Sequence, residues 1–420
     1  MKKIIEIKAD AGFNQSQMPT NSLAPVLGEA TISGLTNPPP LSLYIHLPWC
    51  VKKCPYCDFN SHESRHKDGE IPEKNYVAAL ILDLELATPQ VWGRKIKSVF
   101  FGGGTPSLFS ADSINAILSA VRMLVPLEYN AEITLEANPG TVDTRHFMGY
   151  KQAGVNRLSL GIQSFNADHL QALGRIHDDQ QAIVAAELAL KTFERVNLDL
   201  MYGLPNQSLQ QALNDVQQAI TLKPDHLSFY HLTLEPNTPF HHTPPSLPDD
   251  DLTADMQVSI EQMMTRNGYE HYETSAFSKP KFQAKHNLNY WQFGDYLGIG
   301  AGSHSKLSYH DKITREIRHK HPNRYLEAAE KADLQQNSFI DKVDMIPQSE
   351  LGFEFMMNAL RLTGGFEIGL FQARTGLNIE MLAKPLKAAR DKGLLTITTT
   401  HIQPTLLGQR FLNELLALFL

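Results

Sequence analysis

Residues 41–62, with the sequence LSLYIHLPWCVKKCPYCDFNSH, hold every cysteine of the 420-residue chain. Cys50, Cys54 and Cys57 follow the spacing C-x3-C-x2-C, directly after an apolar run that predicts a buried strand. A disulfide between two of these thiols would leave the third unpaired, which argues against a disulfide framework. Iron–sulfur clusters normally take four cysteine ligands. A cubane cluster bound by these three would therefore keep one iron open for another ligand.

Two other interpretations of the three cysteines remain open. One is a structural zinc ion with His46 or His62 as the fourth ligand, and the other is a set of unrelated reduced thiols. Structural zinc sites usually draw pairs of ligands from two separated segments, and this sequence has no second pair of cysteines. The pattern therefore favours a cluster.

The composition indicates a protein of the cytoplasm. The formal net charge is −7, so there is no excess of basic residues to attract nucleic acid. Clustered thiols fit a reducing compartment. No apolar run approaches the roughly 20 residues of a membrane span, and Glu6, Lys8 and Asp10 interrupt any signal-peptide core. We expect a soluble cytoplasmic protein without a nucleic-acid partner.

The chain divides into four predicted parts. Residues 1–40 are rich in Asn, Ser, Thr, Pro and Gly and end in three prolines, which predicts a flexible extension with at most a short strand at 4–7. Strands are predicted at 41–46, 98–101, 131–136, 157–161, 196–201 and 226–232. Amphipathic helices are predicted at 73–87, 111–124, 143–153, 178–193 and 208–222. Ser110 is expected to cap the second helix and Gly154 to end the third. This alternation predicts an α/β fold, a partial (β/α)6 TIM-like barrel over residues 41–275 with its helices outside.

Polar motifs follow the predicted strands at the edge that carries the cysteine loop. They are Gly102-Gly103-Gly104-Thr105, Glu136, Gln163 with Arg175 further along, and Asp199. The glycines predict close backbone approach to a ligand, with free backbone N–H donors. Buried polar groups need partners, and a zwitterionic, ribose-bearing ligand would supply them. The alternative is a set of strand-end hydrogen bonds with an internal salt bridge.

Seven motifs together carry a family resemblance. YIHLPWC, CPYCDFNSH, GGGTPS, EANPG, GIQSF, LGRIH and NLDLMYGLP resemble the oxygen-independent coproporphyrinogen oxidase branch of the radical S-adenosylmethionine (SAM) superfamily, from about residue 41 to the end of the chain. The resemblance implies a radical SAM barrel with a [4Fe-4S] cluster on Cys50, Cys54 and Cys57. It also implies that SAM contacts Tyr44, Gly103, Gly104, Thr105, Glu136, Gln163, Arg175 and Asp199.

One departure within this branch favours a different family. The oxidases carry a fourth cysteine, C-x3-C-x2-C-x-C, where this chain has Phe59. Residues 285–291, KHNLNYW, resemble the motif of the HemW haem chaperones, and imply that His286, Asn287, Tyr290 and Trp291 contact haem. Imidazole is a haem-iron ligand and aromatic rings stack on porphyrin, so His286 is the candidate axial ligand. The alternative is that these residues pack the edge of the barrel and His286 is only hydrogen-bonded.

The last 75 residues change to a helical pattern with a late hairpin. Helices are predicted at 350–362, 367–375, 379–392 and 406–418, and a small wing at 394–398 and 402–404. The pattern predicts a winged-helix-like domain over 346–420, with residues 276–345 as a connecting region that holds the haem motif. The segment TITTTHIQ has no lysine or arginine, so a lid or protein-docking role is favoured over DNA binding.

Three functions follow from these motifs. The first is a haem chaperone without oxidase activity, which holds haem as cargo and passes it to haem-requiring acceptor proteins, with membrane respiratory enzymes among the candidates. Its oligomeric state, a homodimer included, is left open. The second is an oxygen-independent coproporphyrinogen III oxidase, in which SAM-derived radical chemistry decarboxylates the porphyrinogen. The third is another radical SAM enzyme that acts on a different small molecule.

Overall fold

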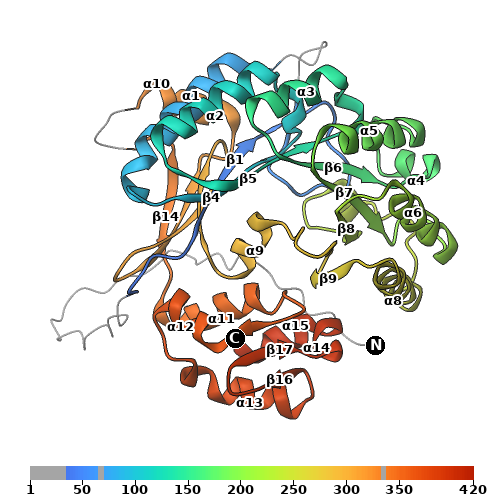
Figure 1. Ribbon diagram of the computed structural model, residues 1–420, viewed down its shortest axis with the longest axis vertical. Helices are drawn as coiled ribbons and strands as arrows, with labels where there is room; N and C mark the ends of the chain where they lie inside the picture. The colour runs from blue at the N-terminus through green and yellow to red at the C-terminus, as the bar shows by residue number, and fades with distance from the viewer. Residues whose placement is uncertain (1–34, 65–70, 333–336) are drawn as a thin grey trace. The chain divides into compact units, whose positions relative to one another are not determined.

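The computed structural model describes residues 35–64, 71–332 and 337–420 (Figure 1). The predicted strand at 4–7 and most of the predicted extension at 1–40 lie outside these residues. Across the described ranges, no helix combines the length and apolar character that crossing a membrane would require.

All six predicted barrel strands are present. They are β1 (Leu41–Leu47), β4 (Ile96–Gly103), β5 (Leu127–Ala137), β6 (Arg157–Gln163), β7 (Arg195–Tyr202) and β8 (His226–His231). Each pairs in parallel with the next in that order. In the described part of the chain β1 pairs with β4 and β11, and β8 with β7 and β10, so the first and last barrel strands do not join. The predicted partial, open barrel is confirmed.

The sheet extends beyond both ends of the barrel, which the six-strand prediction did not include. Next to β1 lies β11 (Asp295–Ile299), which is parallel to it. The sheet then continues with β12 (His304–Ser308), β13 (Ile313–Arg318) and β14 (Ile340–Met345), each antiparallel to the strand before it. Next to β8 lie β10 (Ala276–Ser278) and β9 (Glu270–Glu273). Residues 276–345 therefore contribute five strands to the same sheet, together with α9 and α10.

The predicted outer helices form with their expected ends. They are α1 (Glu73–Ala87), α2 (Ala111–Leu124), α3 (Thr144–Ala153), α5 (Asp179–Thr192) and α6 (Leu209–Leu222). Ser110 accepts a hydrogen bond from the Ser113 N–H at the start of α2, and Gly154 ends α3 with a φ of 110°. The remaining helices of this part are α4 (Ala167–Ala172), α7 (Pro239–His242), α8 (Asp250–Arg266), α9 (Lys285–Trp291) and α10 (Pro322–Glu330). Short 3-10 helices lie at Thr88–Val91, Pro106–Leu108 and Pro139–Thr141.

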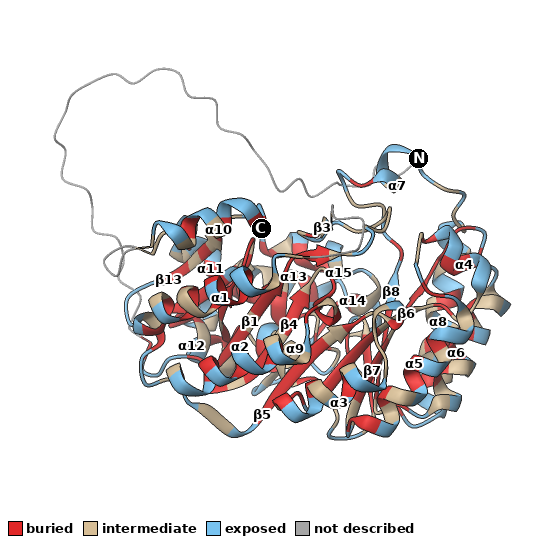
Figure 2. Cartoon of the chain, turned by 90° about the horizontal axis from the view of Figure 1, so that it is seen from above, coloured by how far each residue is buried: buried red, intermediate tan, exposed pale blue. Residues whose placement is uncertain are grey.

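The barrel strands separate an apolar outer layer from a polar interior, and Figure 2 shows these strands as largely buried. Side chains on a strand alternate between its two faces. On β6, Leu158, Leu160 and Ile162 are fully buried in the main hydrophobic core, whereas residues 157, 159, 161 and 163 line an internal cavity. This alternation leaves the interior of the barrel free to hold polar groups.

The C-terminal domain has its own core. Its helices are α11 (Gln348–Ala359), α12 (Ile368–Thr375), α13 (Ala383–Asp391), α14 (Leu406–Arg410) and α15 (Leu412–Leu416), with 3-10 helices at Ile379–Leu382 and Ala417–Phe419. β15 (Phe366–Glu367), β17 (His401–Pro404) and β16 (Leu395–Ile397) form a small antiparallel sheet. Phe355, Phe371 and Ile402 are fully buried between them. The helices and the hairpin agree with the winged-helix-like prediction.

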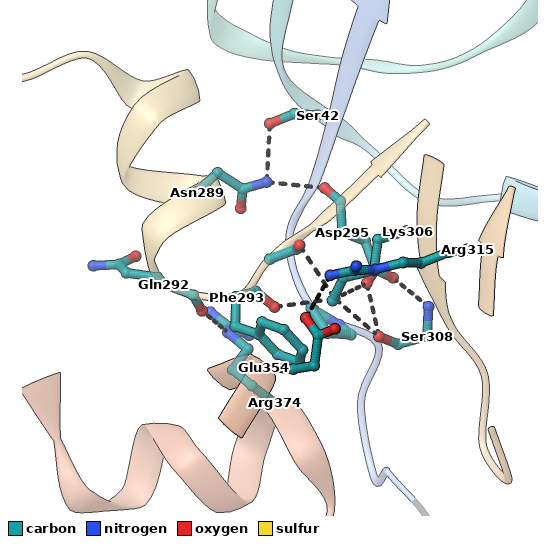
Figure 3. A network of polar contacts seen from close by, with 12 residues as sticks. Ser42, Asn289, Gln292, Phe293, Asp295, Lys306, Ser308, Arg315, Glu354 and Arg374 are labelled. Carbon is teal, nitrogen blue, oxygen red and sulfur yellow. Dashed lines mark hydrogen bonds and ion pairs between the residues drawn. The ribbon is translucent and has the colours of Figure 1, made fainter. Parts of the chain in front are cut away.

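A buried polar network anchors α9 to the sheet (Figure 3). Asn289 of α9 donates to the Ser42 hydroxyl at 2.9 Å and to the backbone carbonyl of Asp295 at 2.9 Å. The Asp295 carboxylate, which is fully buried, pairs with Lys306 at 3.0 Å and with Arg94 at 2.8 Å. Nearby, Arg374 of α12 donates to the Gln292 carbonyl and Arg315 pairs with Glu354 of α11. The helix that carries the KHNLNYW motif is therefore held from both the sheet and the C-terminal domain.

Candidate functional site

A cavity of about 400 Å³ occupies the interior of the barrel. Its lining includes all three cysteines at one end and Asn287 of α9 at another part of the wall. Arg175 lines the cavity from the segment between α4 and α5. The strands and the turns that follow them contribute Gly103, Gly104, Thr105, Glu136, Gln163, Arg157, Asn197, Asp199 and Tyr230. The sequence-predicted cluster and SAM residues are thus brought together, with Tyr44 as the one that is not among the lining residues.

The three cysteines lie on a short loop that the sheet holds in place. Cys50 belongs to β2 (Trp49–Cys50), which pairs with β3 (His62–Glu63), and the Cys57 N–H donates to the Cys54 carbonyl at 3.1 Å. All three are free thiols and are partly buried. The Thr105 hydroxyl donates to the Cys50 sulfur at 3.4 Å. The Arg175 guanidinium lies 3.7 Å from the Cys54 sulfur.

The geometry of His46 does not support the zinc interpretation. Its Nε2 donates to the Asn60 carbonyl at 2.9 Å, and its Nδ1 therefore accepts from the Tyr44 hydroxyl at 3.1 Å. Both ring nitrogens are in use, and burial lowers the pKa of His46 to about 4, so the ring is neutral. Among the described residues, no three His, Cys, Asp or Glu side chains converge on a single ion. A cubane does not require such convergence, because each thiolate binds a different iron. His46 instead ties Tyr44 to the cysteine loop.

The glycine turn after β4 has a packing role that the sequence did not predict. A Cβ on Gly103, whose φ is 116°, would lie 2.6 Å from the His46 ring, and one on Gly104 would lie 2.5 Å from the Trp49 carbonyl oxygen. The N–H groups of Gly104 and Thr105 donate to the carbonyls of Leu47 and Trp49, both at 2.8 Å. The expectation of free backbone donors is therefore wrong for these two residues. The glycines allow the turn to pack directly against the cysteine loop.

Two carboxyl groups face the cavity from neighbouring parts of the barrel. Burial raises the pKa of Glu136 to about 8, and the negative charge of Asp199 adds to the shift, while the Gly103 N–H opposes it. Burial also raises the pKa of Asp199, although Asp199 accepts hydrogen bonds from Ser159 and Asn197, both at 2.8 Å. Both carboxyl groups therefore resist ionisation. A cationic ligand would favour their charged forms.

Gln163 and Arg175 are positioned by β6 and the loop that follows it. Gln163 has a φ of 67°, which turns the chain at the end of the strand. Asp215 of α6 holds this turn, because it accepts from the Ser164 hydroxyl at 2.6 Å and from the Phe165 N–H at 2.8 Å. Arg175 donates to the Gly161 carbonyl at 2.8 Å. Its Nε is buried and has no hydrogen-bond partner among the described residues, so the guanidinium retains a donor.

The four residues of the predicted haem motif separate into two pairs. His286 lies inside the barrel, stacked on Phe100 with ring centres 4.6 Å apart, and its Nδ1 is 3.4 Å from the Ser98 hydroxyl. Asn287 lines the cavity. Tyr290, by contrast, is 38% exposed and packs edge-on against Trp291. The guanidinium of Arg361 lies 4.5 Å from the centre of the Trp291 ring.

The structure adds residues that the motif search missed. Arg157, Ser159, Asn197, Ser228 and Tyr230 also line the cavity. All are inward-facing residues of β6, β7 or β8. A signal was present, because polar residues at 157, 159 and 163, and at 197 and 199, alternate with apolar ones in strands that should otherwise be wholly buried.

Comparisons with known proteins agree with this fold. Residues 44–219 match the profile of the radical SAM superfamily, and residues 346–411 match that of the HemN C-terminal domain. The fold is similar to that of coproporphyrinogen III oxidase (HemN) from Escherichia coli, with a TM-score of 0.76 over 92% of each chain and 21% sequence identity. Residues 44–219 therefore form a domain of the radical SAM superfamily, and this domain implies a [4Fe-4S] cluster and SAM binding.

Closer relatives define the family within that class. The chain is 48% identical to the protein named "Heme chaperone HemW" from Escherichia coli over 387 residues, which is 91% of this chain and 98% of the relative. It is also 48% identical over 391 residues to the protein of the same name from Haemophilus influenzae, with the same two shares covered. A third, from Bacillus subtilis, is 31% identical over 90% of this chain and 99% of the relative. The chain belongs to the HemW haem chaperone family.

Proposed function

We propose that this protein binds haem and delivers it to haem-requiring acceptor proteins, on a radical SAM scaffold that carries a [4Fe-4S] cluster. The observation that carries the proposal is the 48% identity with HemW haem chaperones over nearly the whole length of both chains. It is supported by Phe59, which is 62% exposed and stands where the related oxidases have a fourth cysteine. We retain the division into 41–275, 276–345 and 346–420 as part of this proposal.

Cys50, Cys54 and Cys57 are proposed to hold the cluster. Burial raises the pKa of the Cys50 and Cys57 thiols, so these groups would remain protonated without a bound metal. Iron binding would displace those protons, because the thiolate is the metal ligand. The donor from Thr105 to Cys50 would stabilise the thiolate. The cluster, when bound, would supply an open iron for SAM and a source of single electrons.

The remaining cavity residues are proposed to hold SAM. Glu136 and Asp199 would accept hydrogen bonds from its amine and ribose hydroxyls, and Arg175 would pair with its carboxylate. Gln163 offers an amide at the turn after β6, and Tyr44 is oriented by His46 at the inner end of the cysteine loop. Gly103, Gly104 and Thr105 would shape the wall on that side.

His286 is proposed as the haem-iron ligand. Burial lowers its pKa to about 4, which keeps the imidazole neutral. Its Nδ1 is close to Ser98, whereas its Nε2 has no hydrogen-bond partner among the described residues and is open to a metal. Tyr290 and Trp291 would offer aromatic contact one helical turn further on, and Asn287 lies at the cavity wall. Haem bound to a protein through imidazole has a distinct absorbance spectrum.

An anaerobic haem titration of the cluster-loaded protein tests the proposal. The expected result is a saturable absorbance change near one haem per chain, which His286→Ala weakens and His242→Ala, a change at an exposed histidine, does not. Transfer to an apo haem protein should follow on mixing. The absence of haem binding, together with SAM consumption when coproporphyrinogen III is added, would contradict the chaperone function and support the oxidase. Sedimentation of the loaded and unloaded protein would decide whether a homodimer forms.

A further inference from the structure

The wall of the barrel cavity contains a second arginine besides Arg175. Arg157, the first residue of β6, is 3% exposed and lines the cavity together with Asn287. In the described part of the chain its guanidinium makes no hydrogen bond and no ion pair within 4 Å. A buried cation without an anionic partner is unfavourable, because the interior solvates it poorly. Arg157 therefore has hydrogen-bonding capacity that an anionic ligand in the cavity would use.

The acidic groups near Arg157 are engaged elsewhere. Glu132 pairs with Arg195 at 3.0 Å and also accepts from the His286 N–H at 3.1 Å. The Asp199 carboxylate is held by Ser159 and Asn197. Glu136, with its pKa raised to about 8, is protonated at neutral pH in the empty cavity. None of the three carboxyl groups neutralises Arg157 through a direct contact.

Arg157 and Arg175 enter the cavity from different positions along its wall. Arg175 contacts Gly161, four residues further along the same strand, and the Cys54 sulfur. The backbone positions of residues 157 and 161 on a strand are about 13 Å apart. If Arg175 takes the carboxylate of SAM beside the cluster, Arg157 is left for a second carboxylate.

We propose that Arg157 is a carboxylate subsite that receives a propionate of the tetrapyrrole cargo. The inference rests on the proposed haem-binding function and adds the group that Arg157 recognises. Two observations favour the cargo over a second SAM molecule. Asn287 of the KHNLNYW motif shares the cavity wall with Arg157. The backbone N–H of His286, next to Asn287, also donates at 3.1 Å to Glu132 of β5, two residues before Thr134, which is the register partner of Arg157.

Haem and its dimethyl ester separate this subsite from general haem affinity, because the ester has the same ring and iron but no carboxylate. The full-length, cluster-loaded protein is titrated anaerobically with each, as wild type, Arg157→Met, Arg157→Lys and Arg266→Met, a control at an exposed arginine on α8. We expect the wild type to bind haem about 10- to 100-fold more tightly than the ester, as for a lost charge-assisted hydrogen bond. Arg157→Met should lose that preference through weaker haem binding, Arg157→Lys should keep part of it, and Arg266→Met should keep all of it.

The outcomes distinguish this inference from the proposed function. Haem binding by the wild type with no preference over the ester would overturn the subsite and leave the chaperone function standing, whether or not the variants fold. No binding of either compound by the wild type would overturn both. A parallel titration measures the affinity of the same proteins for SAM and for decarboxylated SAM. If Arg157→Met weakens only SAM, the carboxylate belongs to SAM and the propionate assignment is wrong.

Discussion

The protonation of Glu136 gives a quantitative prediction for SAM binding. The pKa of this buried side chain is raised to about 8, whereas an ordinary glutamate titrates near 4.3. Burial is the main cause of this rise in pKa, and the negative charge of Asp199 is the second. At pH 6.5 Glu136 is therefore protonated in the empty cavity. SAM carries a permanent positive charge on its sulfonium, and it should bind best when this carboxyl is ionised.

The sign and size of the effect follow from proton linkage. Because binding favours the ionised form, SAM must displace a proton from Glu136 below pH 8. Because the group is already half protonated at pH 8, the affinity should fall by about 16-fold between pH 8 and pH 6.5, or about 1.6 kcal/mol. Above pH 8 this group adds at most about a further twofold. Glu136→Gln should remove this part of the pH dependence, because an amide does not titrate.

Calorimetric titration of SAM into the cluster-loaded protein measures the effect. The dissociation constant is compared at pH 6.5, 7.25 and 8.0 for the wild type, Glu136→Gln and Glu270→Gln, a control at an exposed glutamate on β9. The amine of SAM also titrates in this range, so the informative quantity is the difference in slope between wild type and Glu136→Gln. Equal slopes in these two proteins would refute the argument, and so would a flat profile for the wild type.

Three further predictions concern the groups that support the site. Arg318→Met should lower the free energy of unfolding by about 3–5 kcal/mol in denaturant titration, because it leaves the buried Asp83 carboxylate, now 3.2 Å from Arg318, without its cation; adding Asp83→Asn should recover much of the loss. Burial raises the pKa of Asp215 to about 6, so its ionisation destabilises the fold by up to about 3 kcal/mol as the pH rises from 4 to above 6. Asp215→Asn should therefore flatten the pH dependence of thermal unfolding. Gly103→Ala should reduce iron incorporation after cluster reconstitution, because its methyl group would collide with the His46 ring. A normal iron content in that variant would contradict the packing role of the turn.

The barrel was predictable from sequence because local signals and packing agree there. All six predicted strands and the five outer helices form, and α1 and α2 have the predicted bounds. Caps such as Ser110 and the αL glycine Gly154 act through contacts within a few residues, which a sequence pattern can reveal. The outer strands β9 to β14 were not included, although β9 with β10 and β12 with β13 pair close together in the sequence, because their attachment to the barrel depends on more distant pairings. The pairing of β11 with β1, for example, joins residues about 250 positions apart.

The candidate site was predictable as a set of residues but not as a geometry. The motifs identified the cysteines and about a third of the cavity lining, yet they gave the glycine turn free N–H donors, which instead bind the carbonyls of Leu47 and Trp49. They also treated residues 286–291 as one haem surface. The seven-residue helix α9 directs His286 into the barrel and leaves Tyr290 partly exposed, because its buried Asn289 is bound to Ser42 and Asp295. Such a direction depends on tertiary contacts.

Strand β6 shows why stability and ligand binding are separable in this fold. Its odd-numbered residues, among them Arg157 and Gln163, face the cavity, and its even-numbered residues Leu158, Leu160 and Ile162 belong to the hydrophobic core. Because side chains alternate with a period of two, a shift of one residue in register would place the arginine in the core and the leucines in the cavity. The apolar residues therefore fix the register that points the polar ones inward. The polar residues can then differ according to the ligand while the sheet remains stable.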